Sequence, residues 1–155
     1  MLNSKILFLF IITSSFAQAQ ETNYDLFLHE SFYHKSNIVV GFEIISLHKD
    51  STYTFVWVDI EWNYNTVVFA CSKKYKYNSD TLILESFGNV KIKYLQKDDK
   101  TIVPLSQNKR GKYKRNKKTK FIKQTKLSDN YKQILEQHGF FVKPEGITTP
   151  DEFKE

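Results

Sequence analysis

The chain contains a single cysteine, Cys71, among its 155 residues. One cysteine excludes an intramolecular disulfide, so the fold has to be stabilised by apolar burial and by the hydrogen bonds of a β-sheet. Cys71 ends the apolar run that begins at Val67. We therefore expect its side chain to be a small buried hydrophobic group.

Long apolar runs are also missing beyond the start of the chain, so we expect no transmembrane segment in the mature protein. A positive segment ending at Lys5 precedes an apolar run from Ile6 to Ile12 and the small-residue motif Ala17-Gln18-Ala19. This order is typical of a cleavable secretory signal peptide. We therefore expect residues 1–19 to be removed, with Gln20 as the new N-terminus, and the mature protein to be secreted or periplasmic.

Motifs that bring catalytic chemistry are absent: there is no Gly-rich phosphate loop, no G-x-S-x-G and no C-x-x-C. His29 and His34 are five residues apart, which on a strand sends the rings to opposite faces, so we expect neither a metal site nor another cofactor. Asp59 and Glu61 share a face of a predicted strand and are the only candidate pair for a hydrolase. Because a polar strand end that runs into Asn63 and Asn65 explains them better, a binding protein is favoured over an enzyme.

Between residues 25 and 105, β-branched and aromatic residues alternate with short polar clusters. This pattern predicts six to eight antiparallel strands joined by short turns. The clearest turn is Asn78-Ser79-Asp80, after which Leu82 and Leu84 should face the core. The run 90–94 alternates similarly, with its two lysines in water and its apolar residues inside. The predicted fold class is mainly β: an antiparallel meander that forms a curled sheet or a small open barrel.

One segment, residues 53–62, is apolar on both faces. Tyr53, Phe55 and Trp57 point to one side, while Val56 and Val58 point to the other. Such a strand is either buried on both sides or lines an apolar cavity. In the second case, Tyr53, Phe55 and Trp57 are the candidate residues for binding a small apolar ligand.

Residues 109–126 carry ten basic side chains and no acidic one, whereas the rest of the mature chain is net acidic. The candidate anion-binding residues are Lys109, Arg110, Lys112, Lys114, Arg115, Lys117, Lys118 and Lys120. Outside the cytoplasm the abundant polyanions are lipid headgroups, polysaccharides and acidic proteins, so we expect an anionic surface as the partner and not nucleic acid. The alternative is a solvated edge whose lysines prevent aggregation.

The C-terminal part predicts one short helix. Ser128 suits an N-cap, Tyr131 and Leu135 follow helical spacing, and Gly139 is placed to end the helix. The predicted organisation is a β domain over residues 20–127, which includes the basic segment 109–126. A helix over 128–139 and an irregular tail over 140–155 follow it.

Two stretches carry a resemblance to known proteins: Leu47-x-x-Asp50-Ser51-Thr52-Tyr53-Thr54-Phe55 and Lys76-Tyr77-x-x-Asp80-Thr81-Leu82-Ile83-Leu84. Together with the exported start, they resemble small uncharacterised secreted bacterial proteins with a lipocalin-like β-meander, over roughly residues 40–105. The resemblance implies an up-and-down sheet or barrel and no active site.

These observations favour a non-catalytic exported binding protein or envelope-associated protein. Its ligand is either a small apolar molecule or an anionic surface such as lipid headgroups or polysaccharide. A hydrolase that uses Asp59 and Glu61 is the remaining hypothesis.

We predict that the protein purified from its native envelope begins at or beside Gln20, because Ala17 and Ala19 occupy the small positions that a signal peptidase requires. Mass spectrometry of the N-terminal peptide tests this. A soluble exported form that still carries Met1 would contradict it.

Overall fold

Short polar turns between alternating runs fold most of this chain into an antiparallel meander. The computed structural model describes residues 24–33, 38–60, 66–86, 90–107, 110–116 and 118–150, and the predicted signal peptide lies outside them. The elements are β1 (Tyr24–Phe32), β2 (Val39–His48), β3 (Thr52–Ile60), β4 (Thr66–Asn78), β5 (Thr81–Glu85), β6 (Lys91–Asp98), β7 (Thr101–Gln107), β8 (Tyr113–Arg115), β9 (Phe121–Gln124), α1 (Asp129–Gln137), β10 (Phe141–Lys143) and β11 (Gly146–Thr148).

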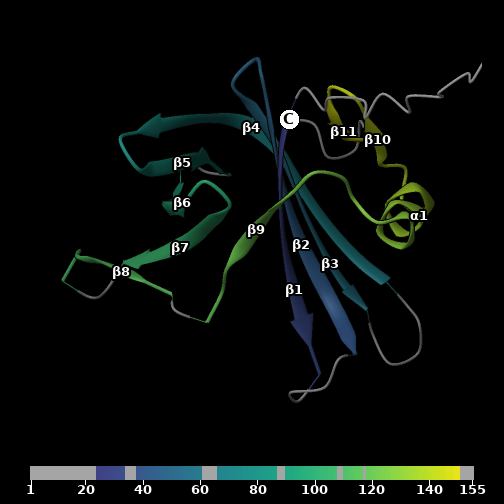
Figure 1. Cartoon of the computed structure of the whole chain (residues 1–155), viewed down its shortest axis with the longest axis horizontal. Coiled ribbons are helices and arrows are strands. Elements are labelled where there is room, and N and C mark those ends of the chain that lie inside the picture. Colours follow the sequence, from purple (N-terminus) through teal and green to yellow (C-terminus); the bar gives the residue numbers. More distant parts are fainter. Residues whose placement is uncertain are drawn as a thin grey trace, which may run out of the picture.

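The first seven strands pair in chain order, and β9 then closes the sheet (Figure 1). β9 pairs on one side with β1, where Phe27 lies opposite Lys123, and on the other with β7, where Ile102 lies opposite Phe121. Strands β1 to β7 and β9 therefore form a closed antiparallel barrel of eight strands, and β8 adds to β7. The predicted mainly β, antiparallel class is confirmed, and closure makes the barrel compatible with a lipocalin-like one.

The predicted turns hold the register of the barrel. β4 ends at Asn78 and β5 starts at Thr81, with Ser79 in the left-handed region at φ 54°. In the turn between β2 and β3, the Asp50 carboxylate accepts a hydrogen bond of 2.9 Å from the Thr52 amide. The Ser51 amide also donates to the His48 carbonyl at 3.3 Å, so a backbone hydrogen bond and an Asx contact together stabilise this turn.

Side chains from all eight barrel strands meet in its interior. This interior cluster consists of Phe27, Ile45, Leu47, Tyr53, Cys71, Leu82, Leu84, Tyr94, Ile102 and Phe121. The expected burial of Cys71, Leu82 and Leu84 is confirmed. In the run 90–94, however, only Tyr94 is buried, while Val90 is 58% and Ile92 39% exposed. Alternation was predicted correctly there, but it could not show how far the core extends along the strand.

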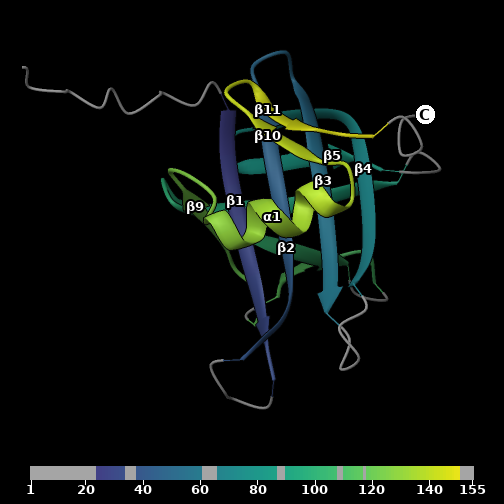
Figure 2. The ribbon, with the colours of Figure 1, turned by 90° about the vertical axis from the view of Figure 1, so that its right-hand side faces the viewer.

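A second apolar layer covers the outside of β1 to β4. This outer cluster consists of Tyr24, Leu26, Leu28, Phe42, Ile44, Val56, Val58, Ala70, Leu127, Tyr131, Leu135, Phe140 and Ile147. Figure 2 shows α1 lying across β1 to β3, with β10 and β11 beside it. The outer layer explains why residues 53–58 are apolar on both faces: Val56 and Val58 pack under it, and Tyr53 packs inside the barrel.

The helix is capped as its sequence predicts. The Ser128 hydroxyl accepts a hydrogen bond from the Tyr131 amide, and Gly139, at φ 79°, follows the last turn. The Tyr131 hydroxyl donates to the Glu30 carboxylate on β1, which ties the helix to the barrel. The tail differs from the irregular segment expected, because β10 and β11 pair as a hairpin.

His48 joins this hairpin to the barrel. Its two ring nitrogens lie 3.1 Å from the hydroxyl oxygens of Thr52 and Ser46. A Cβ on Gly146 would come within 2.4 Å of the His48 ring, so only glycine allows β11 to approach. Burial lowers the pKa of His48, and the nearby Asp50 partly opposes that effect.

We predict that Leu82→Asp and Leu84→Asp each unfold the domain, whereas Lys91→Asp and Lys93→Asp are nearly silent. Both leucines are at most 1% exposed, and burying an unpaired carboxylate costs several kcal/mol against a total stability of about 5 to 15 kcal/mol. Thermal melts of the four variants test this. Equal losses in both pairs would mean that the assigned faces are wrong.

We also predict that His48 makes stability fall in mild acid. Because its folded pKa lies below its unfolded value of about 6.5, the unfolded chain binds the proton first, and this contribution is lost as the pH falls below about 6.5. The gap in melting temperature between wild type and His48→Gln should shrink between about pH 7.5 and pH 5. A gap that stays constant or widens would contradict this assignment.

Candidate functional site

Within the basic segment, β8 lies along the end of β7 that β9 leaves free. β9 pairs only with Thr101 and Ile102 at the start of that strand, which leaves its other end for β8. There Leu105, Ser106 and Gln107 pair with residues 113–115. The segment therefore folds back as a hairpin beside β6 and β7, on the side of the barrel opposite α1 (Figure 1).

Alternation along β8 sorts its three exposed residues into two directions. Arg115 pairs with Leu105 and shares a face with Tyr113, whereas Lys114 points to the other side. The Lys93 ammonium lies 4.3 Å from the centre of the Tyr113 ring, a cation–π contact between β6 and β8. At this exposed position the contact adds only a little to the pairing with β7 that holds β8 in place.

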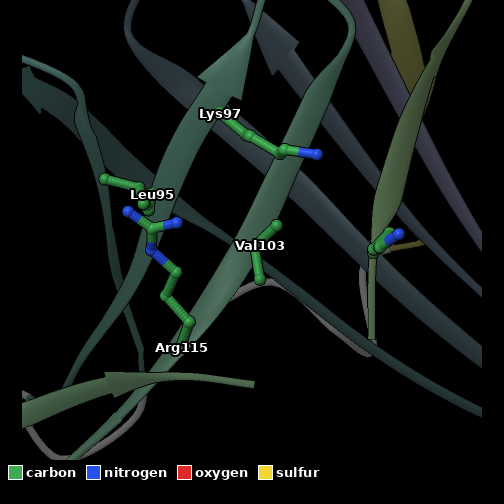
Figure 3. A pocket seen from close by; sticks show the side chains of 5 residues that line it. Leu95, Lys97, Val103 and Arg115 are labelled. Atoms are coloured by element: carbon green, nitrogen blue, oxygen red, sulfur yellow. The ribbon is translucent and has the colours of Figure 1, made fainter. Parts of the chain in front are cut away.

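A pocket of about 250 Å³ opens on that outer face. It is lined by Leu95, Lys97, Val103, Arg115 and Lys120. Leu95 and Val103 lie opposite each other on β6 and β7, and both point outward because their neighbours Tyr94 and Ile102 point into the barrel. In Figure 3, Arg115 extends from β8 toward Leu95, and Lys97 reaches across the neighbouring strand.

The floor of the pocket is apolar. Val103 is only 5% exposed, although it belongs to neither the interior nor the outer cluster. Leu95 beside it is half-buried. The three cations stand around these two side chains, and no carboxylate is among the described lining residues. The arrangement can hold an anionic group next to hydrocarbon.

Nearby groups position this pocket. His29 donates a hydrogen bond of 2.9 Å from Nδ1 to the Lys120 carbonyl. Its ring packs against Phe121. This holds the backbone of Lys120 against β1. The Asp98 carboxylate accepts a hydrogen bond from the Lys100 amide, and its contacts with Thr101 and Lys100 lower its pKa. Asp98 is thus engaged by its own turn.

The structure brings together only some of the predicted basic residues. Arg115 and Lys120 line the pocket, and Arg110, Lys112, Lys114 and Lys118 are exposed elsewhere on the segment. Lys109 and Lys117 lie outside the described residues. Sequence reasoning missed Leu95, Lys97 and Val103. Their signal was the outward position of Leu95 between Lys93 and Lys97, which interrupts an otherwise charged face.

The three aromatic candidates on β3 have different environments. Tyr53 is 1% exposed, its hydroxyl donates to the Glu85 carbonyl, and burial raises its pKa. Phe55 is partly buried against the interior cluster. Trp57 remains 37% exposed. It lies opposite Glu43 on β2. Burial raises the pKa of Glu43, and the nearby His29 partly opposes that effect. Of the three, Trp57 keeps the most surface for a ligand.

The remaining features add little chemistry. A hollow of about 400 Å³ at the start of α1 includes both Glu30 and Lys126, so its charges are mixed. Asp59 lies opposite Gly41, and Glu61 lies outside the described residues. Among the described residues, no group of three or more His, Cys, Asp or Glu could hold a metal ion. In the same part of the chain, no helix has the length and hydropathy to cross a membrane.

Comparisons with protein-family models, with curated proteins and with solved structures each found no match for this chain. Its function is therefore inferred from its own residues.

Proposed function

We propose that this protein is a non-catalytic exported protein that binds anionic lipid membranes through the cationic side chains around β8. The observation that carries the proposal is the pocket in which Lys97, Arg115 and Lys120, from three separate segments, surround Leu95 and Val103. Cations grouped over apolar side chains match a surface that presents anionic headgroups above hydrocarbon.

Charge and exposure support this partner. Each Lys or Arg close to an anionic membrane contributes about 1 kcal/mol, so a group of them gives useful affinity without any single strong contact. Tyr113 is 45% exposed beside these cations, and tyrosine is favoured where one end of a side chain is apolar and the other is wet. A polysaccharide would use the charges but not the apolar side chains.

The expected secretion and the resemblance to lipocalin-like proteins also support this proposal. The signal-like start supports a location in the periplasm or outside the cell, where membrane lipids are accessible and nucleic acid is not expected. The closed antiparallel barrel and the two turn motifs support membership of the lipocalin-like secreted proteins that the sequence resembles.

A second candidate function is binding of a small apolar ligand against inward-facing apolar side chains. Trp57 and Ile92 share their faces with interior residues, yet they are 37% and 39% exposed. Inward-facing apolar side chains that stay exposed are suited to a ligand. The hydrolase hypothesis has no comparable observation among the described residues.

We predict that the mature protein binds vesicles containing anionic phospholipid, but not neutral ones, and that this binding weakens steeply between about 0.1 M and about 1 M salt. The screening length falls from about 10 Å to about 3 Å over that range. Replacing Lys114, Arg115, Lys117 and Lys118 together by Gln should lower the vesicle affinity at least about a hundredfold, at about 1 kcal/mol per charge. Vesicle cosedimentation measures both effects.

The matched control replaces Lys49, Lys74, Lys76 and Lys143, exposed lysines of other strands and turns, by Gln. It removes the same charge and should bind nearly as well as wild type, and both variants should melt close to wild type. If wild type ignores anionic vesicles at low salt, or if both quadruple variants lose binding equally, the proposed surface is wrong.

A further inference from the structure

We infer that the pocket between β6, β7 and β8 is a discrete site for one amphiphilic anion, a phosphate or carboxylate head joined to a hydrocarbon chain. This inference rests on the proposed membrane association and goes beyond it. The strength of diffuse attraction to a membrane depends only on the number of charges. Binding at a discrete site depends on particular cations and on a particular apolar floor.

The apolar floor is the first argument. On the outer face of an antiparallel barrel, alternation normally places polar side chains. Here Leu95, Val103 and Leu105 all point outward, and Val103 is nevertheless 5% exposed. Neither α1 nor the β10–β11 hairpin covers this face; both lie over β1 to β3 (Figure 2). Because neither element covers this face and the pocket there has a volume of about 250 Å³, a short hydrocarbon can lie over Leu95 next to an anionic head.

The three cations are the second argument. Arg115 carries a planar fork of donors that matches the paired oxygens of a phosphate or a carboxylate. Lys97 comes from β6, and Lys120 comes from the segment that the His29 hydrogen bond holds against β1. Lys97 lies on β6, Arg115 on β8 and Lys120 directly before β9, so their backbone positions are set by three separate segments of the barrel and not by a single loop.

The size of the pocket limits the ligand. Its 250 Å³ is below the range of roughly 300 to 1,000 Å³ that encloses whole drug-sized molecules. The pocket can therefore hold a head group and the first few methylenes, with the rest of the chain outside. This is the part of a lipid that an attached protein can reach without extracting the molecule from its membrane.

The test uses octyl phosphate, below its micelle concentration, and inorganic phosphate as separate probes on the mature protein. Methyl NMR signals of Leu95 and Val103 report occupancy, and calorimetry gives affinity. Octyl phosphate should bind at least tenfold more tightly than inorganic phosphate, because each buried methylene contributes about fourfold in affinity. Leu95→Ser should reduce that ratio.

The matched pair of charge variants is Arg115→Gln and Lys114→Gln. Both lie on β8 and lose one charge, but only Arg115 lines the pocket. Arg115→Gln should lower the affinity for octyl phosphate at least about tenfold, which is the typical effect of losing a hydrogen bond to a charged group. Lys114→Gln should change the affinity for octyl phosphate less than about twofold. Lys114 points away from the pocket, so this variant removes only screened electrostatic attraction.

Three outcomes separate this inference from the proposed function. If octyl phosphate binds no more tightly than inorganic phosphate, or if the two β8 variants lose equal affinity, the discrete site is overturned even when vesicles still bind. If octyl phosphate shifts both methyl signals with the expected dependence on Arg115 but anionic vesicles do not bind, the site stands and membrane association fails.

Discussion

Closure of the barrel depends on one short strand, β9, which pairs with both β1 and β7. An open sheet leaves two edges of unpaired backbone groups, and closing it removes both. Closure also brings Phe121 against Tyr94, with ring centres 5.5 Å apart, so the interior cluster becomes continuous around the barrel. The ion pair between Lys123 and Asp25, at 2.6 Å, secures the same junction.

The shortness of β9 also determines where the basic segment lies. Because β9 occupies only the first residues of that edge of β7, β8 can pair with the rest, and Arg115 is placed opposite Leu105 of β7, from where its side chain extends toward Leu95 (Figure 3). A longer β9 would cover that edge and leave no pairing position for β8. The cationic pocket is thus a consequence of how the barrel closes.

The other side of the barrel is committed to stability. α1 and the β10–β11 hairpin bury the outer faces of β1 to β4, and hydrogen bonds from Tyr131 to Glu30 and from Thr54 to the Ile147 carbonyl join the two layers. Thr54 donates to the Ile147 carbonyl at 3.2 Å, so a polar residue of β3 reaches the hairpin through a buried contact. The outer face of β6, β7 and β8, which α1 does not cover, is therefore the face available for binding.

The sequence alone determined the local features of this protein. Alternation and turn residues predicted the mainly β fold, the Asn78 turn and the burial of Leu82 and Leu84, and the capping residues predicted α1, because these patterns depend on near neighbours. The C-terminal hairpin is local and was missed, but its docking on β3, the covered face of Val56 and Val58, and the exposure of Ile92 depended on contacts between residues far apart. The same is true of the candidate site: a run of lysines indicated positive charge, but only the tertiary structure set Arg115 and Lys120 beside Lys97, Leu95 and Val103, because strand pairing decides which distant residues share a face.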